Sequence, residues 1–278
     1  MNTQNEPAKL YLELMRKTLS YALWPDPGKP LEAVLHHAPA LLRFPARLVA
    51  RLFRTANLGI VHQIPYTDAQ REAGNFWPAQ AHSMVGPRRL ENIQFCVESV
   101  LKDEVPGDLI ETGVWRGGSC ILMRAVLAAH GVKDRRVWVA DSFEGLPKPD
   151  AEKYPQDQGD PHHAYDYLAV SQTQVAENFR KYGLLDDQVK FLKGWFKDTL
   201  PTAPIEKLAV MRLDGDMYES TMDALNALYG KLSKGGYCII DDYALHNCKQ
   251  AVEDFRAKHR IESPLLEIDW SGRYWRKV

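Results

Sequence analysis

The stretch DLIETGVWRGGS, residues 108–119, decides the fold class of this chain. Its first five residues form a short strand pattern, and a helix pattern follows over residues 117–130. The glycines between them let the backbone turn tightly and come close to a ligand, and a helix N-terminus attracts negative groups. The glycine spacing differs from G-x-G-x-x-G and the loop lacks the lysine of a P-loop. The stretch is typical of a ligand-binding strand–turn–helix unit, and a dinucleotide-binding loop or a tight turn without a ligand would look similar.

Outward from this unit, strands and helices alternate to the C-terminus. This pattern predicts an α/β fold with a mostly parallel, seven-stranded, Rossmann-like sheet covered by helices on both faces. The short turn at 269–272 predicts that the last two strands form an antiparallel hairpin at the sheet edge. The expected strands are 108–112, 136–140, 189–192, 208–213, 237–240, 265–268 and 273–277, and the expected helices are 117–130, 170–182, 220–232 and 247–259.

The residues before the sheet read as a separate helical region, so we predict a boundary between 1–105 and a core at 106–278. Apolar spacing indicates helices at 10–23 and 87–104. Residues 41–60 form a basic amphipathic segment with Arg43, Arg47, Arg51 and Arg54 at helical spacing. Such a helix can lie on a membrane surface. Packing on its own domain or on a partner subunit is the favoured interpretation, because a large apolar face is usually buried.

Composition excludes several classes of function. The net charge of -1 gives no general attraction to nucleic acid or to an anionic membrane. No run of about 18 apolar residues predicts a membrane span, and no signal peptide is apparent at the N-terminus. The four cysteines show no C-x-x-C pairing, which is typical of a protein in the reducing cytoplasm.

Four aspartates follow two apolar strands of the predicted sheet. Asp214 and Asp216 come after the strand at 208–213, and Asp241 and Asp242 after the strand at 237–240. Ligands of open α/β sheets bind at the carboxyl ends of strands, and neighbouring strands would bring these carboxylates together. Crowded like charges raise each other's pKa, and a hard cation such as Mg²⁺ resolves the conflict. Solvated aspartates at loop ends are the alternative interpretation, and two such clusters favour the metal.

Another acidic residue, Asp141, ends the second strand and is followed by Ser142. An acidic side chain at this position commonly binds the ribose hydroxyls of a nucleoside. The connection that follows, 142–170, is long and rich in Pro, Gly, Asp and His, with His162 and His163 near its middle. A loop of this length inside a compact domain is usually functional or disordered.

Together these motifs resemble the macrocin O-methyltransferase family, whose members methylate sugar hydroxyls of macrolide and aminocoumarin antibiotics. The motifs are MVGPRRLEN (84–92), ETGVWRGG (111–118), DSFEGL (141–146), GWFKDTLP (194–201), LDGDMYES (213–220) and IDDY (240–243). The resemblance implies a class I methyltransferase fold, S-adenosylmethionine as methyl donor, Mg²⁺, a small-molecule hydroxyl acceptor and a homodimer.

The resemblance also assigns roles to particular residues. It places the metal ligands at Asp214, Asp241 and Asp242. It leaves two alternatives for the base that deprotonates the acceptor hydroxyl, Asp216 and His162. The implied cofactor contacts, with Trp195 or Phe196 stacked on the adenine, are Met84, Glu111, Gly113, Ser119, Asp141, Ser142, Trp195 and Phe196.

Other functions stay open at this point. A Mg²⁺-dependent O-methyltransferase of phenols or catechols would share the sheet and the carboxylates but would need a flatter acceptor pocket. The first loop argues against a nicotinamide-dependent oxidoreductase. The crowded aspartates argue against a binding module without catalysis. Residues 24–72 depart from the family pattern, so the sequence leaves the acceptor unidentified.

Overall fold

The computed structural model describes residues 6–31, 35 and 39–278. Its centre is a seven-stranded sheet in the order β5-β4-β3-β6-β7-β9-β8. The first five of these strands pair in parallel, and β9 pairs antiparallel with both β7 and β8, as predicted. The strands are β3 Asp108–Thr112, β4 Val137–Asp141, β5 Val189–Lys193, β6 Leu208–Leu213, β7 Leu232–Ile240, β8 Leu266–Glu267 and β9 Arg273–Arg276.

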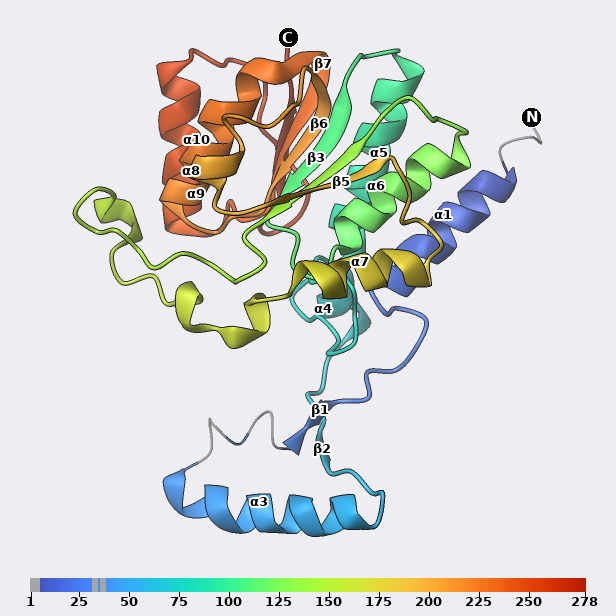
Figure 1. Cartoon of the computed structure of the whole chain (residues 1–278), viewed down its shortest axis with the longest axis vertical. Helices are drawn as coiled ribbons and strands as arrows, with labels where there is room; N and C mark the ends of the chain where they lie inside the picture. The colour runs from blue at the N-terminus through green and yellow to red at the C-terminus, as the bar shows by residue number, and fades with distance from the viewer. Residues whose placement is uncertain (1–5, 32–34, 36–38) are drawn as a thin grey trace.

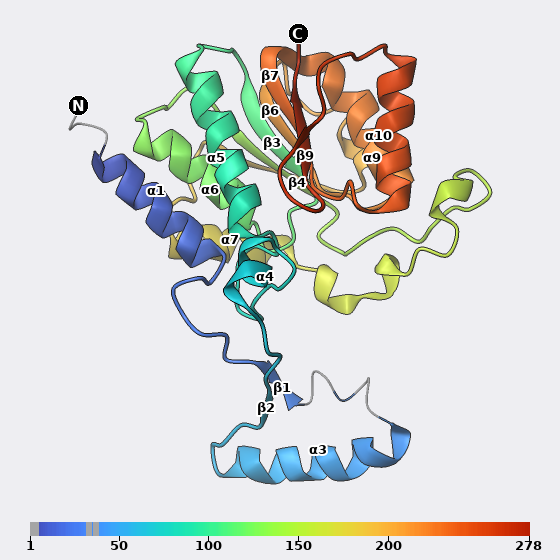
Figure 2. The ribbon, with the colours of Figure 1, turned by 180° about the vertical axis from the view of Figure 1, so that it is seen from behind.

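Helices cover both faces of the sheet (Figures 1 and 2). One face carries α1 Glu6–Leu19, α5 Pro87–Lys102, α6 Gly118–Ala129 and α7 Gln172–Lys181, and the other carries α8 Phe196–Thr199, α9 Tyr218–Leu228 and α10 His246–Lys258. The connection from β4 to α7 contains three short 3-10 helices, η3 Pro155–Asp157, η4 His162–Ala164 and η5 Asp166–Leu168, and η6 Tyr229–Lys231 follows α9.

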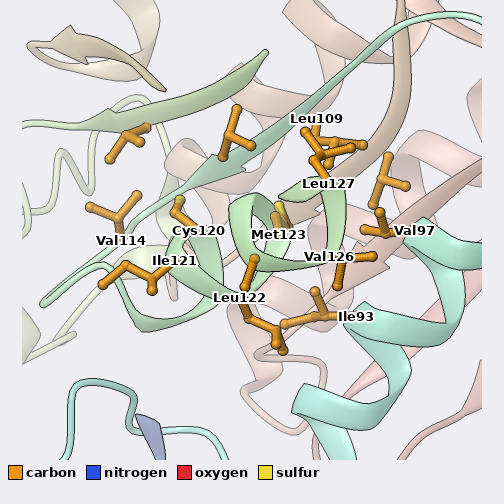
Figure 3. Packing of buried hydrophobic residues seen from close by; sticks show 14 of the residues in the cluster. Ile93, Val97, Leu109, Val114, Cys120, Ile121, Leu122, Met123, Val126 and Leu127 are labelled. Atoms are coloured by element: carbon orange, nitrogen blue, oxygen red, sulfur yellow. The ribbon is translucent and has the colours of Figure 1, made fainter. Parts of the chain in front are cut away.

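Alternating side chains of the central strands explain this layering. Leu109 of β3 is buried in one apolar cluster, whereas its neighbour Ile110 is buried in the cluster on the opposite face. Both faces are therefore covered, as is usual for parallel strands. Figure 3 shows how α6 fills the first cluster, with Leu122 and Val126 beside Ile93 of α5.

The predicted boundary at residue 105 does not coincide with a gap in packing. Helix α1 packs on α6, and α5 packs on both α1 and α6, so two helices before the boundary form part of the layer over the sheet. The first helix ends at Leu19, earlier than expected, and Tyr21 then adopts a positive φ of 58°. Among the described residues, no helix is long and apolar enough to cross a bilayer.

The basic amphipathic segment lies apart from the sheet. It forms α3 Ala40–Thr55, which is connected to the core through the two-stranded sheet of β1 Lys29–Pro30 and β2 Val61–His62 and then α4 Asp68–Glu72. Figures 1 and 2 both show α3 at the far end of this projection. Leu41 and Phe44 are 90% and 79% exposed, so α3 does not bury its apolar face on its own domain. Burial against a partner subunit, as in the predicted homodimer, stays a prediction.

Candidate active site

The carboxyl ends of β3, β6 and β7 meet at one rim of the sheet, as the sequence predicted. Gly113 follows β3 with a φ of +85°, and a Cβ atom there would lie 1.7 Å from the carbonyl oxygen of Asp214. Only glycine fits this crossing. The N–H of Asp214 donates to the carbonyl of Thr112 (2.9 Å), and the N–H of Asp241 donates to the carbonyl of Leu213 (2.9 Å). The backbone thus fixes the starting points of the loops after β3, β6 and β7.

Three carboxylates come together at this rim. Asp214, Asp216 and Asp242 each offer an oxygen, and these oxygens lie within 4.8 Å of one another. The N–H of Asp216, a residue with a positive φ of 57°, donates to Oδ2 of Asp242 (3.1 Å). Two of the three predicted metal ligands, Asp214 and Asp242, therefore lie together, and Asp216 lies beside them.

The third predicted ligand, Asp241, has different partners. Its two carboxylate oxygens pair with Arg212 and Arg89, both buried. Arg212 is 0% exposed and also pairs with Glu111 and, at 2.7 Å, with Asp214. Arg89 pairs in addition with Asp269 at 2.9 Å. The buried guanidinium of Arg212 thus contacts both Asp241 and Asp214, and that of Arg89 contacts Asp241.

The remaining negative charge of the group is poorly compensated. Burial raises the pKa of Asp214 and of Asp242, and the charge of neighbouring aspartates raises both further. The pKa of Asp216 rises to about 7 for the same reasons, burial first and the charge of Asp214 second. Clustered carboxylate oxygens are the ligands that hard divalent cations prefer. The residues present therefore fit a Mg²⁺ ion, which would remove this repulsion.

A cavity of about 300 Å³ opens beside the carboxylates over the ends of β3, β4 and β5. Of the eight predicted cofactor residues, six line it: Met84, Gly113, Asp141, Ser142, Trp195 and Phe196. Asp141 accepts the N–H groups of Val114 and Phe143, each at 2.7 Å, which fixes the loops after β3 and β4 against each other. The half-buried rings of Trp195 and Phe196 give this cavity an aromatic wall.

The other two predicted cofactor residues, Glu111 and Ser119, line a second cavity of about 250 Å³. Glu111 lies at its base, where Sγ of Cys120 donates to its carboxylate at 2.9 Å and Arg212 pairs with it. Burial raises the pKa of Glu111 to about 7, although Arg212 opposes the shift. Four large aromatic side chains also line this cavity: Trp77, Trp115, Tyr167 and Trp270.

The two cavities share the carboxylate rim. Asp214 and Asp216 line both of them, and Met84, Trp115 and Leu168 lie on their common border. Both base candidates, Asp216 and His162, line the second cavity. A molecule in the first cavity and a molecule in the second would therefore meet at Asp214 and Asp216, with His162 on the side of the second cavity.

Sequence reasoning missed the two arginines. Arg212 is the single charged residue in the buried strand LAVMRL of β6, and this pattern could have predicted a buried acidic partner for it. A charge is rarely buried on a central strand without a partner. Arg89 lies within the MVGPRRLEN motif, but its side-chain pairing with Asp241 and Asp269, more than 150 residues away, leaves no local pattern.

Comparison with known sequences gives consistent matches along almost the whole chain. The family model described as macrocin-O-methyltransferase (TylF) matches residues 8–277. The chain is 48% identical over 276 residues to demethyldecarbamoylnovobiocin O-methyltransferase of Streptomyces niveus, covering 99% of this chain and 95% of that protein. It is 45% identical over 272 residues to mycinamicin III 3''-O-methyltransferase of Micromonospora griseorubida, covering 97% and 96%.

Another relative is an 8-demethyl-8-(2,3-dimethoxy-alpha-L-rhamnosyl)-tetracenomycin-C 4'-O-methyltransferase of Streptomyces olivaceus. It is 50% identical over 268 residues, which cover 96% of this chain and 92% of that protein. Among solved structures, the O-methyltransferase NovP superimposes with a TM-score of 0.83 at 48% identity, covering 98% of this chain and 99% of that chain. The calicheamicin methyltransferase CalS11, at 20% identity and a TM-score of 0.57, covers 68% of this chain and 78% of its own, and supports the fold alone.

Proposed function

Because the chain belongs to the macrocin O-methyltransferase family, we propose that it transfers a methyl group to a hydroxyl of a deoxysugar or glycoside in a secondary metabolite. The predicted family and the predicted fold are confirmed, and the chain is an S-adenosylmethionine-dependent O-methyltransferase. This assignment excludes the two alternative functions considered from the sequence, a nicotinamide-dependent oxidoreductase and a binding module without catalysis. The acceptor and the requirement for Mg²⁺ are the parts that we propose.

One observation supports this proposal above all: two cavities meet at a single group of carboxylates. The first cavity has the features that the nucleoside half of S-adenosylmethionine needs, namely an acidic residue at the end of β4 and two aromatic rings. When bound, S-adenosylmethionine supplies a methyl group activated by its sulfonium. The loop after β6 contributes Asp214 and Asp216 to both cavities, so a methyl donor in the first cavity and a hydroxyl acceptor in the second would be oriented toward each other.

We assign the Mg²⁺ ion to Asp214 and Asp242, with Asp241 as the third ligand. Each oxygen of Asp241 pairs with an arginine, and a carboxylate oxygen has a second lone pair that stays available to a cation. A bound Mg²⁺ would supply Lewis acidity that stabilises negative charge developing on the acceptor oxygen. Arg212 and Arg89 hold the carboxylates in place, and Asp216 or His162 takes the hydroxyl proton.

The second cavity is the proposed acceptor site. Its aromatic side chains Trp77, Trp115, Tyr167 and Trp270 offer flat apolar surfaces, and its carboxylates offer acceptors for hydroxyl protons. The three relatives described above are named as O-methyltransferases, and the name of one of them gives a rhamnosyl-bearing substrate. A glycoside, with polar sugar edges and apolar ring faces, matches this combination of surfaces.

An acceptor screen tests the proposal. The purified protein is incubated with S-adenosylmethionine, Mg²⁺ and either deoxysugar glycosides or catechols, and products are detected by the mass gained from one methyl group. Methylation of glycosides and not of catechols is the expected result. Methylation of catechols alone would show that the phenol alternative is correct.

Trp195 provides a prediction for the donor cavity. Trp195→Ala is expected to weaken S-adenosylhomocysteine binding about 10- to 100-fold, because stacking of a base on an aromatic ring contributes roughly 1–3 kcal/mol. Isothermal titration calorimetry with S-adenosylhomocysteine measures the change. Trp270→Ala is the matched control, since Trp270 lines only the second cavity and its loss should leave this affinity near the wild-type value. Equal affinities of the two variants would contradict the assignment.

A further inference from the structure

The long connection between β4 and α7 is fastened to the core by a buried aspartate. Asp157 is 1% exposed and accepts the N–H groups of Tyr218 (2.7 Å) and Glu219 (2.9 Å), which begin α9. It also accepts Nδ2 of Asn247, in the first turn of α10, at 3.1 Å. Free N–H groups at a helix N-terminus are satisfied in this way by an aspartate. The middle of the connection is therefore anchored to the starts of two helices.

The same Asn247 also holds a second aspartate. Its Nδ2 donates to Oδ2 of Asp160 at 3.0 Å, while Asn247 itself is buried. The side chain of Asp160 is 7% exposed. Asn247 therefore fixes Oδ2 of Asp160, and Oδ1 of the same carboxylate is the oxygen that contacts His162.

Oδ1 of Asp160 holds His162. It accepts the backbone N–H of His162 at 2.9 Å and lies 2.8 Å from Nδ1 of its ring. A carboxylate oxygen accepts hydrogen bonds, so this contact favours the tautomer of the neutral imidazole in which Nδ1 carries the hydrogen and Nε2 keeps a lone pair. The ring also lies nearly perpendicular to the ring of Tyr165, with 5.6 Å between ring centroids. These contacts leave Nε2 as the basic atom of the ring.

His162 lines the second cavity together with Asp216 and Asp242. Its neighbour His163 is exposed, and Nδ1 of that ring lies 3.2 Å from the carbonyl of Asp160 instead of its carboxylate. Asp216, the other base candidate, has its carboxylate within the group proposed to hold the cation. Of the two candidates, His162 is the one whose basic atom stands outside that group.

We propose that Asp160 is a positioning residue, oriented by Asn247, that fixes His162 in the tautomer whose Nε2 takes the proton of the acceptor hydroxyl. This inference rests on the proposed function. In the step, the hydroxyl proton passes to Nε2 and the oxygen forms a bond to the methyl carbon. The carbon–sulfur bond breaks with its electron pair left on sulfur, so the products are a methyl ether, S-adenosylhomocysteine and an imidazolium. Asp160 stabilises this imidazolium, which then loses its proton to water.

The test combines turnover with a spectroscopic readout. Single variants Asp160→Asn and His162→Ala and the double variant are compared with His163→Ala, the matched control. Asp160→Asn and His162→Ala are each expected to lower kcat about 100-fold or more, the range of a lost proton-transfer group, with KM for S-adenosylmethionine near the wild-type value. The double variant should be no slower than His162→Ala, because Asp160 acts through that ring. His163→Ala should keep wild-type kcat.

Nitrogen-15 NMR of the wild-type protein reads the tautomer directly, with the His162 signals assigned by their loss in His162→Ala. A hydrogen on Nδ1 supports the proposal, and a hydrogen on Nε2 overturns it whatever the kcat of the variants. Asp160→Asn should have no further effect once His162 is removed. If it lowered kcat by the same factor in His162→Ala as in the wild type, the proposal would also be overturned. If the wild type methylates no glycoside, the proposed function fails. A wild type that is active and insensitive to both substitutions would refute the roles of Asp160 and His162 alone.

Discussion

Asp214→Asn is expected to reduce methyl transfer roughly a thousandfold or more. Asp214 lines both cavities and belongs to the carboxylate group proposed to hold Mg²⁺. An asparagine keeps the size of the side chain but loses the charge that a hard cation needs. Lewis-acid stabilisation contributes several kcal/mol, and each 1.4 kcal/mol corresponds to about a tenfold change in rate. Steady-state turnover and Mg²⁺ titration by calorimetry measure the two effects.

The control for this substitution is Asp187→Asn. Asp187 is exposed in the turn before β5, away from the carboxylate group, so turnover and Mg²⁺ affinity should stay at the wild-type level. If Asp214→Asn retained turnover within tenfold of the wild type and still bound Mg²⁺ with the same affinity, Asp214 would not be a ligand.

Arg212→Met is expected to lower the free energy of unfolding by about 3–5 kcal/mol, because removing one partner of a buried ion pair leaves uncompensated charge. Arg212 is 0% exposed and pairs with Glu111, Asp214 and Asp241. Methionine occupies a similar volume but pairs with none of them. Urea unfolding of the two proteins measures the difference.

Two comparisons separate this effect from a general loss of arginine. Arg180 pairs with Glu177 on the surface, where both side chains are more than half exposed, so Arg180→Met should cost less than about 1 kcal/mol. Adding Glu111→Gln to Arg212→Met should recover part of the lost stability, because it removes one of the buried charges. Equal stabilities of Arg212→Met and Arg180→Met would refute the structural role of Arg212.

The sheet and its helices could be predicted because their signals are local. The short strand pattern at 108–112 and the apolar run at 208–213 are buried and give β3 and β6 with the expected bounds. Strand β7 begins at Leu232, five residues earlier than expected. Residues 232–236 include Ser233, Lys234 and two glycines, and a register shift carries the pairing with β6 past them. Such pairing depends on the neighbouring strand and not on apolar spacing.

The carboxylate rim could be predicted because strand order fixes which loops meet. Pairing of β6 with β7 was expected, and it brings Asp214 and Asp242 together. The arginines that hold Asp241 and the aspartates that fasten His162 depend on side chains far apart in the sequence, for which a single sequence carries no periodic signal. The helix pattern of residues 41–60 predicted α3, but spacing alone could not say what covers its apolar face.

The most direct test of the account is methyl transfer to a glycoside acceptor with the metal removed and restored. The protein is dialysed against EDTA, incubated with S-adenosylmethionine and the acceptor, and assayed by mass spectrometry before and after Mg²⁺ is added. The account predicts that EDTA abolishes transfer and that Mg²⁺ restores it. Undiminished transfer in the presence of EDTA would contradict the central claim that the carboxylates at the ends of β6 and β7 hold a metal ion that the reaction requires.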